Sequence, residues 1–456
     1  RFPLPLYGTI PKRMKEQEKI PVSKVKRAAK LVSTGAKIGG NYVKYYAKKV
    51  VGNEHAKQDL IEDNAEDIYK SLSELKGGAL KMAQIISMDK GMMPAAFTEK
   101  FAQAQYSAPP LSYPLVVKTF RQNFGKSPSE IFDTFSKHAT NAASIGQVHK
   151  ASLNGKTFAV KIQYPGVADS VKSDLKLVKP IAMRMMGVKE KEIKQYLDEV
   201  ESKLLEETDY KLELKQSIEV GSACKKMDGV FFPNYYPALS GDRILTMDWL
   251  EGMHIKEFLK TNPTQETTNI IGQRLWDLYD FQLNNLKAIH ADPHPGNFLF
   301  KADGSVGVID FGCVKRIPEE FYSKYFRLMD DRLLHNSDDE LMRLFIDLDF
   351  ITTEDSEEER NMFFDVFKNL MQLLTKPFRA DEFYFGGDKY YNSVHEYGLE
   401  LSKRKDLKKA GNARGSKHLV FVNRTYLGLY SLLNELNATI KTTVSFNFDK
   451  EKQNFT

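Results

Sequence analysis

The sequence predicts an α+β protein with a helical N-terminal extension and two lobes, the first rich in strands and the second mostly helical. Three observations lead to this fold class. Apolar residues recur at helical spacing before about residue 125. Strand-like runs, with one long helical pattern among them at roughly 191–224, occupy residues 145–249. From about residue 255 the pattern is helical again and is interrupted only at residues 290–312.

The composition is that of an ordinary globular protein. Apolar residues make up 42% of the 456 residues and charged residues 28%, which excludes a disordered chain, a collagen and a coiled coil. No run approaches the roughly 18 apolar residues that a membrane-spanning helix needs. Cys224 and Cys313 are too few for a disulfide framework or a cysteine-based zinc site. They are typical of a reducing compartment, and we expect a cytoplasmic protein.

The positive charge is concentrated at the N-terminus. The chain has a net charge of +6, but residues 1–50 hold 13 Lys and Arg against 2 Asp and Glu, so residues 51–456 carry −5. No basic patch interleaved with aromatic residues and no base-reading motif accompanies this charge, so no nucleic-acid partner is expected. Four prolines make residues 1–21 an irregular basic arm.

Residues 22–50 are expected to form a basic helix, and two interpretations of it stay open. The helix can lie on an anionic membrane with its apolar side down, which would place the protein peripherally on the inner face of a membrane. Alternatively, Lys24, Lys26, Arg27, Lys30 and Lys37 form a solvated face and the apolar residues of the helix pack on the core. These apolar residues are Val22, Val25, Leu31, Val32, Ile38 and Val43.

Helical spacing continues through residues 55–90, and prolines then divide the chain into shorter helices. We therefore assign residues 22–134 to a helical N-terminal extension, residues 135–250 to the strand-rich lobe and residues 251–456 to the helical lobe.

The strand-rich lobe begins with a predicted hairpin. Runs at 145–153 and 157–164 flank Asn154-Gly155, a turn pair that tolerates positive φ. Lys161 lies in the second, apolar run, where an unpaired ammonium group is costly. It therefore needs a partner from the following helix, unless it is an edge lysine that points to water.

Residues 243–252 run from a strand into an acidic turn. In a kinase this segment is the hinge that binds adenine, with Met247 as gatekeeper and Trp249 in the hinge. A core strand followed by a turn is an equal alternative from this segment alone.

The segment from His290 to Asn297 carries the chemistry. It has the H-x-D-x4-N spacing of a kinase catalytic loop. Asp292 can supply the carboxylate near the attacking oxygen, and Asn297 an amide oxygen for a magnesium ion. By itself the segment could also be a Pro/Gly turn with an aspartate cap.

A second metal-binding motif follows at once. Two short strands, Phe298–Phe300 and Val306–Ile309, flank a turn and lead into Asp310-Phe311-Gly312. A hairpin of this kind brings Asp310 to the same end as Asn297. Two protein oxygens plus nucleotide phosphates suit Mg²⁺, so we expect ATP and Mg²⁺ as cofactors. With this motif, the order of elements is that of a two-lobed protein-kinase-like fold.

Here the sequence resembles the UbiB-type atypical kinase family, which is linked to ubiquinone and related isoprenoid-lipid metabolism. The matching segments are HADPHPGN at 290–297, DFG at 310–312, AVK at 159–161, NAASIGQVH at 141–149, ETDYKLE at 207–213 and KMAQ at 81–84. In place of a glycine-rich loop stand Ala142, Ala143 and Ser144, like the alanine-rich loop of the family. The resemblance implies that these three residues bind the nucleotide.

The family also has a K-x-G-Q helix that occludes the protein-substrate groove. Lys81 and Gln84 match it, with Ala83 in place of glycine. The resemblance implies that they engage Glu207 and Asp209, and that Glu213 is the partner of Lys161. Glu207 and Asp209 lie about 200° apart on a regular helix, so both can face the site only if the helix starts or distorts there.

We therefore expect an ATP-binding, Mg²⁺-dependent atypical kinase or ATPase with Asp292, Lys161 and Glu213 as catalytic residues. A prenyl-quinone precursor or another isoprenoid lipid is the expected partner besides ATP and an anionic membrane surface. Two alternatives stay open. One is a small-molecule phosphotransferase, and the other is a non-catalytic lipid-binding scaffold that uses nucleotide as a switch.

Overall fold

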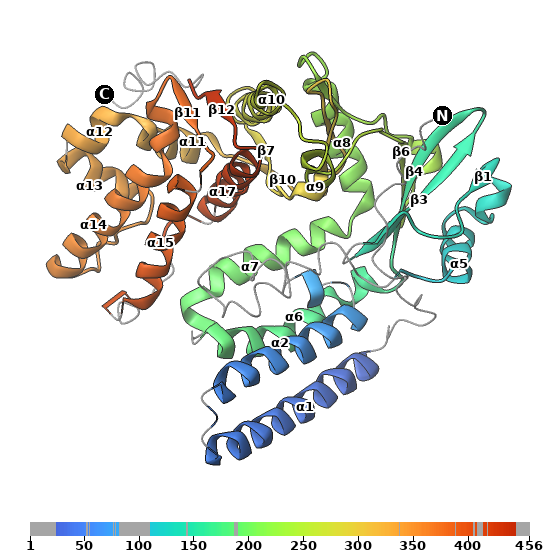
Figure 1. The fold of residues 1–456 in the computed structure, drawn as a ribbon, viewed down its shortest axis with the longest axis horizontal. Helices are drawn as coiled ribbons and strands as arrows, with labels where there is room; N and C mark the ends of the chain where they lie inside the picture. The colour runs from blue at the N-terminus through green and yellow to red at the C-terminus, as the bar shows by residue number, and fades with distance from the viewer. Residues whose placement is uncertain are drawn as a thin grey trace. The chain divides into compact units, whose positions relative to one another are not determined.

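The computed structural model describes residues 24–51, 53, 55–75, 77, 79–81, 110–142, 145–186, 190–336, 338–387, 389–404, 406–407, 414–416 and 418–443. The chain divides into two compact units, which are described separately. The first comprises the described residues of Arg1–Glu190, Leu197–Lys215 and Asn234–Trp249, and the second those of Lys191–Tyr196, Gln216–Pro233 and Leu250–Thr456. The expectation of an α+β fold with a helical N-terminal region is confirmed (Figure 1).

The first unit begins with two antiparallel helices, α1 (Lys24–Val50) and α2 (Ala56–Leu75), which lie side by side in Figure 1. Thr34 Oγ1 donates to Ser71 Oγ at 2.6 Å, whereas Lys48, farther along α1, binds Asp59 at 2.5 Å. Residues later in α1 therefore pair with residues earlier in α2, which is the pattern of antiparallel helices. Buried polar pairs contribute to the contact between the helices.

Arg27 ties α1 to the helix α6 (Val167–Met186). The arginine is 2% exposed, and its Nε and Nη2 donate to the two carboxylate oxygens of Asp174 at 2.6 Å each. Its Nη1 donates to the backbone oxygen of Leu75 at 2.8 Å. A bidentate pair of this kind fixes both position and orientation.

The opposite face of α1 is apolar and points outward. Its side chains are between 60% and 87% exposed, at spacings that return to one face of a helix; they are Val25, Val32, Val43, Tyr46 and Val50. The expectation that the apolar residues pack on the core is therefore wrong for Val25, Val32 and Val43, whereas Ile38 is partly buried. Arg27, which that alternative placed on a solvated face, is buried. Polar side chains such as Arg27 and Asn41 occupy the buried face instead.

A five-stranded sheet forms the rest of this unit. Its strands are β1 (Thr134–Phe135), β2 (Asn141–Ala142), β3 (Gly146–Leu153), β4 (Lys156–Gln163) and β6 (Ile244–Asp248). The order is β1-β3-β4-β6, and β2 also pairs with β3. The predicted hairpin is confirmed, with Asn154 at φ 51° and Gly155 at φ 74° between β3 and β4.

The two faces of β4 have different neighbours. Phe158, Val160 and Ile162 are buried with side chains of α5 (Tyr113–Phe124). Because side chains alternate along a strand, Lys161 points to the other face. Leu245 and Met247 of β6 lie on that face as well.

The helical pattern expected at roughly 191–224 is two helices, α7 (Glu190–Glu207) and α8 (Tyr210–Ala223). Local hydrogen bonds cause the break. Thr208 Oγ1 donates to Leu205 O at 2.8 Å, and Asp209 Oδ1 accepts from Leu212 N at 3.0 Å. Asp209 therefore caps α8, as short polar side chains do at helix starts.

The second unit contains three small sheets. A three-stranded sheet has the order β5-β9-β8, and two pairs are β10-β7 and β11-β12. The strands are β5 (Val230–Phe231), β7 (Ala288–His290), β8 (Phe298–Phe300), β9 (Val306–Val308), β10 (Val314–Arg316), β11 (Glu382–Tyr384) and β12 (Thr439–Lys441). Strands β7, β10, β11 and β12 were not predicted. Each is only three residues long, and the strands of the β11-β12 pair lie far apart in sequence, so local patterns gave no indication of them.

Helices build the remainder of this unit. They are α9 (Ile255–Leu259), α10 (Gln265–Asn284), α11 (Glu319–Tyr325), α12 (Asp331–Asn336), α13 (Asp338–Asp347), α14 (Glu357–Leu374), α15 (Lys389–Lys403) and α17 (Leu419–Glu435). Side chains of α10 and α17 contribute to the largest buried apolar cluster, which also contains Phe298 and Phe300 of β8. Within the part of the chain that the structure describes, no helix has the length and apolar character needed to cross a bilayer.

Candidate active site

Lys161 and Glu213 form a buried ion pair in the first unit. Lys161 Nζ lies 2.7 Å from Glu213 Oε1, and the two side chains are 12% and 1% exposed. Glu213 is in the first turn of α8, after the cap made by Asp209. The Lys161 ammonium also lies 5.3 Å from the ring centre of Tyr210. The pairing that the resemblance implies is present, and the lysine is not an edge residue in water.

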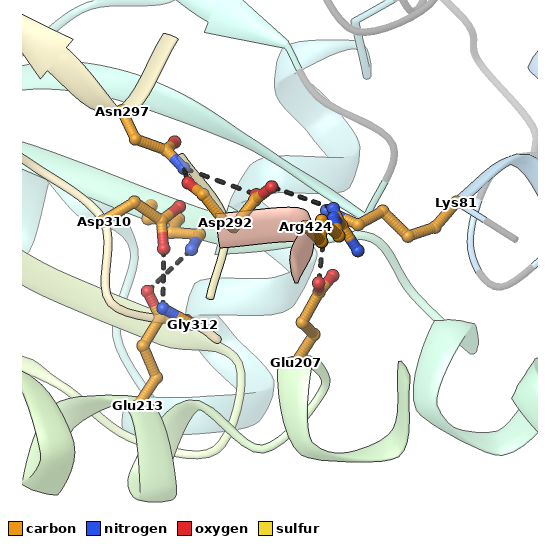
Figure 2. A network of polar contacts seen from close by, with 9 residues as sticks. Lys81, Glu207, Glu213, Asp292, Asn297, Asp310, Gly312 and Arg424 are labelled. Atoms are coloured by element: carbon orange, nitrogen blue, oxygen red, sulfur yellow. Dashed lines mark hydrogen bonds and ion pairs between the residues drawn. The ribbon is translucent and has the colours of Figure 1, made fainter. Parts of the chain in front are cut away.

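Lys81 contacts the end of α7. Its Nζ lies 3.2 Å from Glu207 Oε1, with side-chain exposures of 18% and 10%, and Figure 2 shows this pair. The break after α7 separates Glu207 from Asp209, whose side chain is exposed and caps α8. Gln84, the other residue of the K-x-A-Q motif, lies outside the described residues.

The predicted adenine segment follows β6. Met247 is 5% exposed and packs with Tyr210 and Tyr235 on the sheet face that carries Lys161. The backbone nitrogen of Trp249 donates to Thr157 O at 3.1 Å, which keeps this residue on the sheet.

The residues expected to bind phosphates are only partly described. Ala142 lies in β2, which pairs with β3, whereas Ala143 and Ser144 lie outside the described residues.

The catalytic-loop residues of the second unit are joined by hydrogen bonds. Asn297 Nδ2 donates to the backbone oxygen of Asp292 at 2.9 Å and to its Oδ2 at 3.3 Å. Arg424 Nη2 donates to Asp292 Oδ1 at 3.0 Å (Figure 2). Both carboxylate oxygens of Asp292 are thus held in place. The Asn297 amide oxygen, the atom that a metal would use, takes no part in these bonds.

The β8-β9 hairpin brings Asp310 beside Asn297. The backbone nitrogen of Ile309 donates to Asn297 O at 3.0 Å, immediately before Asp310. Asp310 Oδ1 accepts from Gly312 N at 2.8 Å. One amide and one carboxylate oxygen at a strand end fit Mg²⁺, which binds few protein ligands and keeps waters and phosphates.

The segment after Asp310-Phe311-Gly312 is short. Strand β10 pairs with β7, and only Ile317 and Pro318 lie between the end of β10 and the start of α11 at Glu319. No long activation loop separates the motif from the next helix in this described segment.

His290 is buried at the end of β7. It is 2% exposed, and neither ring nitrogen has a hydrogen-bond partner within the described residues. Its ring packs beside Phe298 and Phe311. Burial lowers the pKa of His290 from its usual value, so the folded protein holds it neutral.

This burial predicts a loss of stability in acid. Below the unfolded-state pKa of about 6.5 the unfolded chain binds a proton that the folded chain does not. The contribution of neutral His290 to the free energy of unfolding should therefore be completely present above that pH. Below it, the free energy of unfolding should decrease by up to about 1.4 kcal/mol per pH unit. Denaturant unfolding of the wild type and His290→Phe at several pH values measures this. If the difference between them does not change with pH, the prediction is wrong.

Sequence reasoning missed Arg424. It is the only charged residue among the fifteen from Leu419 to Leu433, in a helix whose other side chains are mostly apolar. A lone charge in such a helix needs a partner, and this was the available indication. The partner itself, 132 residues away, could not be inferred from the sequence.

Comparisons with known proteins bear on the family and the fold. A family model described as the ABC1 atypical kinase-like domain matches residues 103–343, just over half of the chain. The probable serine/threonine-protein kinase abkA of Dictyostelium discoideum is 26% identical over 466 residues, covering 95% of this chain and 80% of the relative. The mitochondrial atypical kinase COQ8 of Saccharomyces cerevisiae is 29% identical over 370 residues, covering 79% and 72%.

A solved structure is similar as well. Rv3197 of Mycobacterium tuberculosis, in complex with erythromycin, matches with a TM-score of 0.56 and 25% identity. The match covers 86% of this chain and 96% of that one. Together with the family model, it confirms the kinase-like fold class expected from the sequence.

Proposed function

The chain belongs to the ABC1 atypical kinase-like family, and from this premise we propose that it binds ATP with Mg²⁺ and transfers or hydrolyses the γ-phosphoryl group. The observation that carries the proposal is the hydrogen-bonded set of Asp292, Asn297 and Ile309. It places an amide oxygen and the carboxylate of Asp310 at one strand end.

Each residue has a proposed role in the chemistry. Asn297 and Asp310 hold the metal, and Mg²⁺, when bound, neutralises charge on the β- and γ-phosphates. Lys161 binds the α- and β-phosphates and is oriented by Glu213. Asp292 positions the hydroxyl or water that attacks the γ-phosphorus.

The nucleotide and the substrate groove involve further residues. Ala142, Ala143 and Ser144 are proposed to contact the phosphates, and Met247 and Trp249 the adenine. Lys81, Gln84, Glu207 and Asp209 are proposed to limit access for protein substrates, and the ion pair between Lys81 and Glu207 supports this.

The acceptor is proposed to be a prenyl-quinone precursor, another isoprenoid lipid or water, as the sequence resemblance implies. ATP turnover by purified protein, with and without anionic liposomes and a prenyl-quinone precursor mimic, tests this. Turnover that rises with these additions supports the proposal. Mg·ATP binding without turnover under any condition would favour the nucleotide-switched scaffold. Efficient phosphorylation of a water-soluble small molecule would favour the small-molecule phosphotransferase.

The outward stripe of α1 is proposed to bind an anionic membrane surface without insertion. Val25, Val32, Val43, Tyr46 and Val50 lie exposed on one face of a basic helix. Lysines on the flank of α1 are paired with carboxylates of α2, for example Lys48 with Asp59. We therefore expect the apolar stripe to contribute more to binding than the net charge does.

Val43→Asp is expected to weaken binding to anionic liposomes about tenfold, because a charge must then be desolvated within the stripe. Gln58→Asp, on the exposed surface of α2, adds the same charge outside the stripe and should bind nearly as the wild type does. Liposome co-sedimentation measures both. If the two variants are equally weakened, charge alone explains the binding and the stripe has no role.

A further inference from the structure

Helix α17 packs along the catalytic loop and contacts three consecutive residues of it, Ala291, Asp292 and Pro293. Three of its residues on one face, Phe421, Arg424 and Gly428, meet successive positions of the loop. Phe421 is buried with Ala291 and Cys313, Arg424 binds Asp292, and Gly428 lies against Pro293. Residues three and four apart share a helix face, so this side of α17 is matched to the loop over two turns.

The approach of the helix to the loop depends on Gly428. A Cβ atom at this position would lie 2.3 Å from Pro293 Cγ and 3.1 Å from its Cβ. Such distances are far inside van der Waals contact, and the proline ring cannot rotate away. Only glycine permits this spacing. Arg424 lies one turn before Gly428. The short distance between α17 and the loop therefore also determines where the Arg424 guanidinium lies relative to Asp292.

The ion pair is not explained by stability alone. Arg424 and Asp292 are each 17% exposed in their side chains, within a helix that otherwise contributes apolar residues to the core. Removing two charges from water costs free energy that their attraction rarely exceeds, and apolar residues of similar volume are often as stable or more so. Arg424 also lies outside residues 103–343, which the family model matches.

We propose that Arg424 is an arginine finger supplied by the chain itself, which contacts the γ-phosphoryl group of bound ATP, and that Gly428 is its positioning residue. The inference rests on the proposed function, because Asp292 must be the residue beside the attacking oxygen. A guanidinium bonded to Asp292 Oδ1 is then next to the residue that positions the attacking oxygen, and so close to the γ-phosphoryl group. Its planar set of N–H donors matches phosphate oxygens.

The step that Arg424 assists transfers the γ-phosphoryl group from ATP to the acceptor oxygen. A bond forms between the acceptor oxygen and the γ-phosphorus while the bond from that phosphorus to the β,γ-bridging oxygen breaks. The bridging electron pair stays on ADP, and the acceptor's proton passes to Asp292 and then to solvent. Negative charge spreads over the three equatorial oxygens of the phosphoryl group. The guanidinium stabilises this charge through hydrogen bonds to the equatorial oxygens.

The experiment measures ATP turnover and the affinities for Mg·ADP and for Mg·ADP with aluminium fluoride, a mimic of the transferring phosphoryl group. For Arg424→Gln we expect turnover to decrease about a thousandfold. The tighter binding of the aluminium fluoride complex over ADP should be lost, while ADP affinity stays unchanged. The melting temperature should decrease, because Asp292 loses its cation, and the retained ADP affinity shows that the site is still folded. Arg424→Lys should recover part of the turnover. Arg316→Gln, which breaks the exposed pair with Glu219, is the arginine control and should change nothing.

Gly428→Ala tests the positioning role. It should reduce turnover about tenfold and weaken the aluminium fluoride complex with ADP binding retained, because α17 must move away from Pro293. Gly398→Ala on α15 is the matched control, since nothing lies within 4 Å of the added Cβ.

Two outcomes separate this inference from the proposed function. If the wild type neither binds Mg·ATP nor turns it over, the proposed function itself fails. If the wild type is active and Arg424→Gln keeps its turnover, Arg424 is not an arginine finger. The same conclusion follows if Arg424→Gln loses affinity for Mg·ADP and for the aluminium fluoride complex equally.

Discussion

Asp310→Asn is expected to abolish Mg²⁺-dependent ATP binding while leaving the fold intact. The substitution removes the only formal negative charge in the proposed ligand pair of Asn297 and Asp310, and Mg²⁺ prefers charged oxygen ligands. The hydrogen bond from Gly312 N to Oδ1 can persist, because an amide oxygen also accepts. The fold of the hairpin should therefore survive.

The measurement is the unfolding free energy with and without Mg·ATP. At a hundredfold excess over the dissociation constant, the wild type should gain about 2.7 kcal/mol, and Asp310→Asn should gain almost nothing. Asp303→Asn, in the turn of the same hairpin, is the control, since its carboxylate accepts from Ser305 N and is exposed. It should respond to Mg·ATP like the wild type. An equal gain by Asp310→Asn would show that Asp310 is not a metal ligand.

Lys161→Met is expected to reduce both stability and nucleotide binding, and a second substitution can separate the two effects. The single variant leaves the carboxylate of Glu213, 1% exposed, without its cation. Removing one partner of a buried pair costs about 3–5 kcal/mol. In the double variant with Glu213→Gln, the buried charge is gone and most of the stability should return.

The double variant should still fail to turn over ATP, because the cation for the α- and β-phosphates is absent. Denaturant unfolding and an ATPase assay measure the two quantities on the same samples. Lys156→Met on the same strand is the control. Its pair with Asp248 is half exposed on the lysine side, so we expect a change within about 1 kcal/mol and normal turnover. Wild-type turnover by the double variant would remove Lys161 from the site.

Much of the local structure could be predicted because its causes are local. Asn154-Gly155 forms the hairpin turn because both residues adopt positive φ. The spacing from Asp292 to Asn297 and on to Asp310 spans one loop and one hairpin, so the sequence alone brings these residues to one strand end. The partner of Lys161 came from the family resemblance, since the residues alone left four candidates open: Glu206, Glu207, Asp209 and Glu213.

The errors arose where a pattern has more than one physical outcome. A continuous helical pattern hid the break between α7 and α8, where Thr208 and Asp209 bond to nearby backbone groups and end the helix. In α1, hydrophobic spacing left open whether the apolar stripe faces the core or a membrane, and in the structure Arg27 and other polar residues occupy the buried face. Amphipathic spacing defines an apolar face without saying which face is buried.

The sequence by itself therefore determined the fold class, the hairpins, and the loop that holds Asp292, Asn297 and Asp310, because each depends on residues close together in the chain. Only the tertiary structure decided that α1 presents its valines outward and that Arg424 binds Asp292. The physical reason is that such contacts depend on how closely distant segments pack. At Gly428, a missing side chain lets α17 approach Pro293 and carries a charged group to a carboxylate 132 residues away.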